Sequence, residues 1–163
     1  VRHADDEQVS RGTSDRFPFP YTRADGVAFL SGQVVDLSGP VFAIEIAGEA
    51  CGGIGASRLA GERAVGAEIG YWLGRAHWGR GVMTQVVAAF APRVADALGV
   101  LRLQATVLDF NVGSARVLEK KGIRILVWEP VLAPSSLFAP ACRFLISADF
   151  LVTSLSCGFG CCS

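Results

Sequence analysis

The chain has 163 residues, of which 51% are hydrophobic and 18% are charged. This length fits one domain of ordinary size, and this composition excludes a chain that is disordered as a whole. Fifteen Lys and Arg residues balance fifteen Asp and Glu residues, so the formal net charge is zero. Because a non-specific nucleic-acid binder usually carries a basic excess, we expect no nucleic-acid partner.

The charged residues are distributed unevenly along the chain. Positions 1–123 hold 26 of them and positions 124–163 only four, whereas four of the five cysteines lie in the second stretch. The composition therefore predicts a folded body, residues 1–123, and a divergent, apolar, cysteine-rich tail, residues 124–163. We expect this tail to be disordered or to form strands that are not native to the fold, as a shifted reading frame would produce.

Neither the cysteines nor the apolar stretches point to a metal or a membrane. The tail cysteines are irregularly spaced and have no histidine nearby, so no metal site is expected. The apolar stretch from Leu137 to Leu155 contains Pro140, Arg143 and Asp149, so we expect no membrane partner. The first residues lack the apolar core of a secretory signal, which favours a cytoplasmic location.

Two helices are predicted before the first strand. Residues 5–15 have the pattern of a short polar helix. After the Pro-rich stretch 17–21, Thr22 is the expected N-cap of a second helix that runs to about Val35. The apolar face of this second helix consists of Val27, Leu30 and Val34.

The following residues predict a meander of three strands. Residues 41–47 and 51–59 flank Gly48-Glu49 and form the expected hairpin. Residues 67–73 are the clearest strand, because their side chains alternate between two faces. One face carries Ile69, Tyr71 and Leu73, and the other carries Glu68, Gly70 and Trp72.

A long helix is predicted over residues 82–98, where apolar residues recur at every fourth position. Pro92 lies inside it and is expected to kink it, and Gly99 is expected to end it. The apolar stripe consists of Val86, Phe90, Val94 and Leu98.

One more strand and one more helix complete the body. Residues 101–107 predict the strand, and Asn111 is the expected N-cap of a last helix, 112–121, which Gly122 ends. Residues 123–128 have the composition of a further strand, and no periodicity follows them. The order of elements predicts a mixed α/β layer fold, in which helices flank one sheet, rather than a doubly wound fold.

The loop between the strand at 67–73 and the helix at 82–98 is the most informative segment for function. It contains Gly79 and Gly81, which let the backbone approach a ligand closely, and it leads into a helix N-terminus whose free N–H groups attract anions. The loop is neither a P-loop nor a dinucleotide fingerprint. Two glycines at this spacing are also what an ordinary tight turn requires.

Three segments in order resemble the GNAT acetyltransferase superfamily. They are residues 67–73 (AEIGYWL), residues 77–84 (HWGRGVMT) and residues 111–122 (NVGSARVLEKKG). The resemblance covers about residues 1–123 and is closest to the branch of ribosomal-protein N-terminal acetyltransferases. Residues 17–25 also resemble the acceptor-side loop of that branch. It implies an α+β fold with a twisted, mostly antiparallel central sheet flanked by helices. The first strand of that fold would be clipped here.

The resemblance also implies acetyl-CoA as the donor. Backbone amides of the loop and helix start would hold the pyrophosphate, the end of the strand would pair with the pantetheine arm, and the last helix would line the thioester. The implied coenzyme-binding residues are Trp72, Leu73, Trp78, Gly79, Arg80, Gly81, Val82, Met83, Thr84, Asn111 and Ser114.

The expected reaction is direct attack of a primary amine, a protein N-terminus or a small molecule, on the thioester in a ternary complex. Glu68 is the candidate general base, although a solvated strand glutamate or an ion pair with an Arg gives the same pattern. Ser114 is the candidate that holds or protonates the thiolate, although a first-turn serine often bonds only backbone. Tyrosine often acts as the acid in this superfamily, and both tyrosines, Tyr21 and Tyr71, precede the loop.

Further expectations concern the remaining residues and the tail. We expect His77 to be structural, His3 to lie at the surface and Cys51 to be inert core. Relatives continue after the last helix with two more strands, which the tail sequence does not resemble. A catalytically impaired acetyl-CoA-binding module therefore stays open as an alternative, as does a homodimer.

Overall fold

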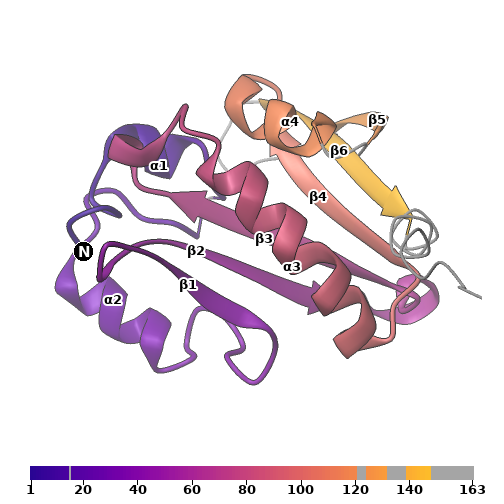
Figure 1. Ribbon diagram of the computed structural model, residues 1–163, viewed down its shortest axis with the longest axis horizontal. Coiled ribbons are helices and arrows are strands. Elements are labelled where there is room, and N and C mark those ends of the chain that lie inside the picture. The colour runs from indigo at the N-terminus through magenta and orange to yellow at the C-terminus, as the bar shows by residue number, and fades with distance from the viewer. Residues whose placement is uncertain (15, 121–123, 132–138, 148–163) are drawn as a thin grey trace, which may run out of the picture.

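The computed structural model describes residues 1–14, 16–120, 124–131 and 139–147, which form a six-stranded sheet with helices on both faces (Figure 1). The helices are α1 (Glu7–Arg11), α2 (Arg23–Leu30), α3 (Val82–Leu98) and α4 (Val112–Glu119). The strands are β1 (Val41–Ile46), β2 (Glu49–Arg58), β3 (Gly66–Leu73), β4 (Arg102–Leu108), β5 (Arg124–Val131) and β6 (Ala139–Ser147).

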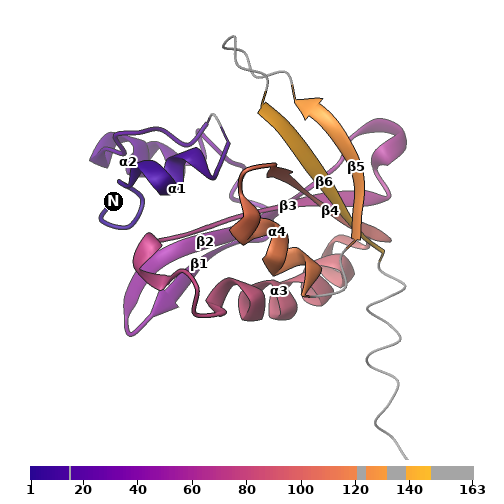
Figure 2. The ribbon, with the colours of Figure 1, turned by 90° about the horizontal axis from the view of Figure 1, so that it is seen from above.

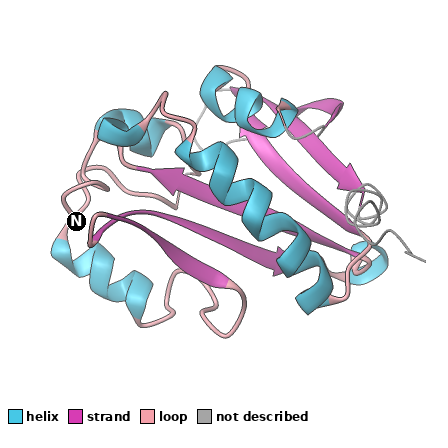
Figure 3. Cartoon of the chain, viewed as in Figure 1, coloured by secondary structure: helices cyan, strands magenta, loops and turns pink. Residues whose placement is uncertain are grey.

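The strands lie in the order β1-β2-β3-β4-β6-β5. Strands β3 and β4 pair in parallel, and the other neighbouring pairs are antiparallel. Helices α1 and α2 lie on one side of the sheet and α3 and α4 on the other (Figure 2). The alternation of helices and strands along the chain can be followed in Figure 3. The predicted α+β fold with a mostly antiparallel sheet is confirmed.

The core lies between α3 and the sheet. Along α3 the predicted positions Phe90 and Val94 are buried, and Val86 and Leu98 are partly buried against the same cluster. The predicted helix bounds are confirmed at both ends, and the helix continues through Pro92 to Gly99, which has the left-handed φ of 58°. Burial of this apolar stripe against β3 and β4 fixes the helix that begins at the glycine loop.

The second helix differs from its prediction. Thr22 caps it as expected, in a capping box with Asp25, but the helix ends at Leu30 rather than near Val35. Gly32, with a φ of 79°, follows this end. Of the predicted apolar face, Val27 is 59% exposed and Leu30 is 75% exposed. Val34 lies beyond the end of the helix, and no element of the described chain buries Val27 or Leu30, so the predicted apolar face is wrong.

The hairpin of β1 and β2 is confirmed, but its turn lies one residue before the predicted Gly48-Glu49, so Glu49 belongs to β2. Its two-residue turn is Ala47-Gly48, with φ values of 53° and 81°. Two left-handed residues in succession make the turn whose twist matches that of paired strands.

Two strands follow the body in the described part of the tail. Strand β5 overlaps the stretch expected as a strand, and no periodicity predicted β6. β6 pairs with β4 along Arg102–Leu108. The expected cap at Gly122 lies outside the described residues. That the tail is non-native stays a prediction.

Candidate functional site

The sheet opens between its two parallel strands. β3 and β4 pair only from Gly66 to Glu68 and from Arg102 to Gln104. Beyond this point β3 continues to Leu73 beside β2, and β4 continues beside β6. Figure 1 shows β3 and β4 diverging from their paired ends. The result is a V-shaped gap whose vertex lies at Glu68.

Hydrogen bonds at the two ends of β3 establish which backbone groups face this gap. The carbonyl of Val65 accepts from the amide of Leu101, on the β4 side. The amide of Gly74 donates to Cys51, on the β2 side. Since backbone groups of successive strand residues turn to opposite edges, the odd-numbered residues of β3 turn toward β4 and the gap.

Tyr71 and Leu73 therefore present their backbone groups at the open edge. The Leu73 carbonyl accepts a hydrogen bond from the indole Nε1 of Trp78 at 2.6 Å, which fixes this tryptophan against the strand end. Trp72 turns its backbone toward β2, and its ring packs edge-on against Phe17, with ring centroids 5.4 Å apart. The open edge is thus available to an extended ligand at Tyr71 and at the Leu73 amide.

The loop after β3 ends at an uncapped helix N-terminus. Gly79 and Gly81 have φ values of 72° and 75°, a conformation that favours glycine. A Cβ atom added to either would meet no atom within 4 Å, so open space surrounds them. Gly81 is the N-cap of α3, no side chain caps it, and the first turn carries no acidic residue. The first N–H groups of α3 and their partial positive charge therefore face open space.

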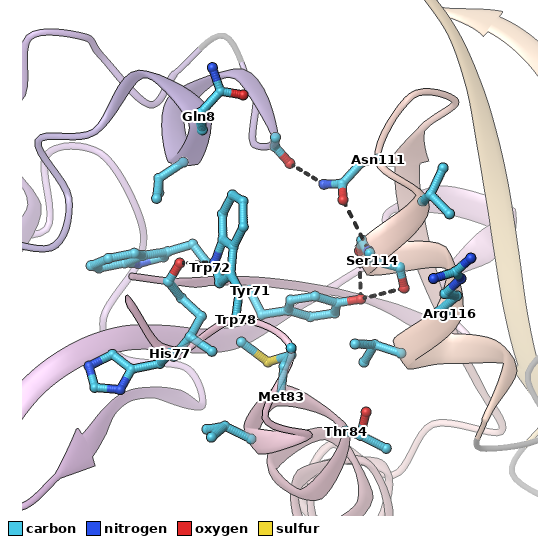
Figure 4. A pocket seen from close by; sticks show the side chains of 18 of the residues that line it. Gln8, Tyr71, Trp72, His77, Trp78, Met83, Thr84, Asn111, Ser114 and Arg116 are labelled. Carbon is cyan, nitrogen blue, oxygen red and sulfur yellow. Dashed lines mark hydrogen bonds between the residues drawn. The ribbon is translucent and has the colours of Figure 1, made fainter. Parts of the chain in front are cut away.

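A cavity of about 650 Å³ joins the gap to this helix start (Figure 4). Every predicted coenzyme-binding residue except Arg80 lines it; Arg80 is exposed in the loop. The charged side chains among its lining residues are all cationic: Arg11, Arg116 and Lys120. Among the described residues that line the cavity there is no carboxylate, so the electrostatics of this lining favour an anionic ligand.

Helix α4 presents a connected set of polar groups to the cavity. Asn111 caps the helix by accepting from the Ser114 amide at 3.0 Å, and its Nδ2 donates to the carbonyl of Gly12 at 2.9 Å. The hydroxyls of Ser114 and Tyr71 lie 2.7 Å apart (Figure 4). The predicted cap at Asn111 is confirmed, and this residue also ties α4 to the end of α1.

A family model described as Acetyltransferase (GNAT) domain matches residues 1–124. The chain belongs to the GNAT family. It is 45% identical over 54 residues to the "Probable N-acetyltransferase YjcK" of Bacillus subtilis. That match covers 33% of this chain and 30% of the relative, so the chain spans less than a third of that relative's length.

Solved structures share this GNAT fold. An acetyltransferase of the GNAT family from Bacillus anthracis superimposes with a TM-score of 0.76 at 19% identity, over 90% of this chain and 86% of the other. yncA from Salmonella typhimurium, solved with its cofactor acetyl-CoA, superimposes with a TM-score of 0.64 at 16% identity, over 80% and 76%.

Glu68 of the GNAT domain lies at the vertex of the gap but outside the lining of the cavity. Its side chain projects from the sheet face opposite the core residue Ile69. Within residues 1–14 and 16–120, its hydrogen-bond partner is Thr106, whose hydroxyl donates to Glu68 Oε1 at 2.7 Å. Of the readings that the sequence allowed, the structure shows neither an ion pair with an Arg in these ranges nor a fully solvated carboxylate.

The two histidines pack together beside the loop. The His77 and His3 rings lie 5.3 Å apart, and His77 also lines the cavity. The expectation that His3 lies at the surface is wrong, because its side chain is only 16% exposed and packs against Gly74. Its Nε2 lies 3.3 Å from a carboxylate oxygen of Glu49. The short segment before α1 folds back on the end of β3, which spacing along the chain does not reveal.

Sequence reasoning missed two parts of the site. The first is α1 and its end, which supply one wall through Gln8, Val9, Arg11, Gly12 and Thr13. The second is Tyr71, whose hydroxyl reaches Ser114 across the gap. The alternation of side chains along residues 67–73 placed Tyr71 on the core face, and this was the signal in the sequence that could have pointed to Tyr71. Nothing local indicated the first.

Burial raises the pKa of the Tyr71 hydroxyl to about 12, against a smaller lowering by its hydrogen bond with Ser114. Tyr71 therefore keeps its proton at neutral pH and can donate it in a hydrogen bond.

The described ranges hold neither a cluster of metal-ligand side chains nor a membrane-spanning helix. No three His, Cys, Asp or Glu side chains gather there as metal ligands would, and no described helix is long and apolar enough to cross a membrane.

Proposed function

We propose that this GNAT domain is an acetyl-CoA-dependent N-acetyltransferase that acetylates a primary amine in a ternary complex. The amine is a protein N-terminus, as the resemblance to the ribosomal-protein branch implies, or a small molecule. The observation that carries the proposal is the gap between β3 and β4, which opens onto the uncapped, glycine-bordered start of α3.

The residues around this gap fit the coenzyme. Its phosphates match the helix start at Gly81 and the all-cationic lining of Arg11, Arg116 and Lys120. Its amide-containing arm matches the open backbone edge of β3 at Tyr71. When bound, the coenzyme supplies an acetyl thioester, an acyl group already activated for transfer.

The geometry suggests how the acceptor amine reaches that acyl group. The proposed phosphate site at the start of α3 lies on the α3 and α4 side of the sheet, and Glu68 projects from the other side at the vertex of the gap. An amine arriving from the α1 and α2 side would meet this carboxylate first, and Glu68 would take its proton. A protein N-terminus, with a pKa near ~7.7–8, needs less help from a base than a Lys amine near ~10.4.

A second candidate function is an acetyl-CoA-binding module without turnover. The hydrogen bond from Thr106 to Glu68 favours it, because this carboxylate is engaged and lies outside the cavity. Release of thiol, followed with DTNB over a panel of amines, would favour the enzyme. Calorimetric binding of acetyl-CoA without turnover would favour the module.

The phosphate assignment is tested with two nearly isosteric substitutions at Gly81. Asn and Asp both tolerate a positive φ, so Gly81→Asn and Gly81→Asp impose the same backbone demand and differ in charge. We expect Gly81→Asp to lose at least about tenfold more affinity for coenzyme A than Gly81→Asn, measured by calorimetry. Equal affinities would show that the phosphates bind elsewhere.

The base assignment is tested with Glu68→Gln, which keeps the shape of the side chain and its bond with Thr106. The expected result is a fall in kcat of about a hundredfold with little change in the affinity for coenzyme A. A loss of less than about threefold would contradict a general-base role.

A further inference from the structure

We propose that Tyr71 is a positioning residue that acts through Ser114: it donates a hydrogen bond to the Ser114 hydroxyl and leaves the hydrogen of that hydroxyl free to bind the departing sulfur. This inference rests on the proposed function, because it concerns the thioester end of the same cavity. It assigns a role to Tyr71, a partly buried polar residue that is not among the implied coenzyme-binding residues.

At this separation either hydroxyl could donate, and the neighbouring contacts favour Tyr71 as the donor. The Tyr71 hydroxyl lies 2.7 Å from Ser114 Oγ but 3.4 Å from the Ser114 carbonyl. If Ser114 donated to Tyr71, the Tyr71 proton would be left with the long contact only. With Tyr71 donating to Oγ, the short bond is made and the serine hydrogen stays free.

The surroundings keep this arrangement in place. The Tyr71 ring packs against the core cluster below α3, and Ser114 lies in the first turn of α4, where Asn111 accepts from its backbone amide. Both hydroxyls line the cavity. Because the tyrosine is on a strand and the serine on a helix, the pair bridges the two sides of the gap. The Ser114 hydroxyl thus bonds a residue of β3 across the gap, which a first-turn serine that bonded only its own helix would not do.

The chemistry needs no proton transfer through the pair. When the amine attacks and the C–S bond breaks, the electron pair of that bond goes to sulfur, and the amine gives up its proton to Glu68 or to water. A hydrogen bond from Ser114, strengthened by one from Tyr71, stabilises the negative sulfur. Tyr71 remains protonated throughout, as its burial requires.

The test measures the thiol pKa of coenzyme A bound to the intact chain, by the ultraviolet absorbance of the thiolate, for four proteins. These are the wild type, Tyr71→Phe, Ser114→Ala and the double variant. Tyr71→Phe keeps the buried ring and removes only the hydroxyl. We expect the wild type to lower the thiol pKa below that of free coenzyme A and both single variants to raise it again by about 0.5–1 unit. The double variant should match Ser114→Ala, because Tyr71 acts only through the serine.

A matched control and a kinetic readout sharpen the test. Tyr21→Phe removes the other tyrosine hydroxyl; the Tyr21 ring packs at a tilt against Phe17 and is not among the residues that line the cavity, so this variant should leave the bound thiol pKa unchanged. Tyr71→Phe should lower kcat about tenfold with the KM for acetyl-CoA unchanged, since the pair acts on the departing sulfur.

The outcomes separate this inference from the proposed function. If the wild type fails to bind coenzyme A, the proposed function is wrong and the inference falls with it. If coenzyme A binds but Tyr71→Phe leaves its thiol pKa unchanged, or if the double variant is worse than Ser114→Ala by the full Tyr71 effect, the inference alone is overturned.

Discussion

Helices α2 and α3 lie on opposite faces of one sheet and are held by different forces. α3 buries an apolar face that includes Val87, Phe90 and Val94, whereas no residue of α2 is buried. The N-terminus of α2 is instead capped by hydrogen bonds between Thr22 and Asp25. Helix α3, on the side of the proposed phosphate site, is thus fixed by packing, whereas α2, on the proposed acceptor side, is held by a small number of polar bonds.

This difference predicts where the molecule is sensitive to mutation. Burial of apolar surface contributes roughly in proportion to area, so core substitutions should lower the free energy of unfolding of the whole domain. Loss of a polar bond on the other face should loosen a segment locally while the core stays folded.

The largest expected effect is in the core. Leu103 on β4 is fully buried, and Leu103→Ala should lower the free energy of unfolding by about 2–5 kcal/mol through lost burial and the cavity left behind. The matched control is Leu30→Ala on α2, where the side chain is 75% exposed and the cost should stay within about 0.5 kcal/mol. Urea unfolding measures both. Similar losses for the two variants would remove the contrast between the two faces.

A smaller effect is expected where the N-terminal segment meets the end of β3. A Cβ atom at Gly74 would lie 2.8 Å from the Cβ of His3, so Gly74→Ala must displace this histidine, at a cost of about 1–3 kcal/mol. Gly70→Ala on β3 is the control, because a Cβ there meets nothing within 4 Å. Amide exchange should show faster opening of α1 in Gly74→Ala only. Unchanged exchange in α1 would mean that the segment before it is held by other contacts.

The third prediction concerns Asn111, whose side chain bonds to helices on both sides of the sheet, to the end of α1 and to the start of α4. Asn111→Ala removes the cap of α4 and the bond to Gly12, and should cost about 1–2 kcal/mol in urea unfolding. Asn111→Asp keeps an oxygen that can cap the helix but loses the Nδ2 donor. It should leave α4 intact and speed amide exchange in α1. If both variants loosened α4 equally, the cap and the tie would not be separable functions of this side chain.

The sequence predicted the packed part of the molecule well. The apolar period predicted α3 from Val82 to Leu98 at both ends, because the residues that set the period are buried or partly buried against the core. The end of α2 was predicted five residues too late, because Val34 fitted the period but meets no partner surface. Periodicity shows which residues could be buried, and burial itself depends on the rest of the fold.

The candidate site divides along the same line. The glycine loop and Asn111 were accessible from the sequence because local chemistry, a positive φ or a helix cap, determines them. The wall formed by α1 and the Tyr71–Ser114 pair were not, since Ser114 lies 43 residues from its partner. Such pairs depend on the strand order and on where β3 and β4 separate, which no local pattern encodes.

The smallest expected effect is the loss of the α2 cap, and it tests the comparison most finely. Thr22→Ala removes the hydroxyl that bonds the backbone and carboxylate of Asp25, while Thr22→Ser keeps it. Because α2 buries nothing, Thr22→Ala should raise amide exchange in α2 by about threefold to tenfold and leave urea unfolding of the core unchanged. The Thr22 hydroxyl and the Thr22 backbone amide both donate to the Asp25 carboxylate, and these two bonds lower the pKa of Asp25 below its usual 3.8.

Because the pKa of Asp25 is lower in the folded state, the ionised carboxylate stabilises the helix at pH values above the unfolded-state pKa. This contribution is lost as the pH falls through the folded-state pKa. The difference in α2 amide exchange between Thr22→Ala and the wild type should therefore shrink as the pH falls below about 4. A difference that stayed constant into that range would assign the cap to the backbone bond alone. A drop in global stability at neutral pH would show that α2 is coupled to the core after all.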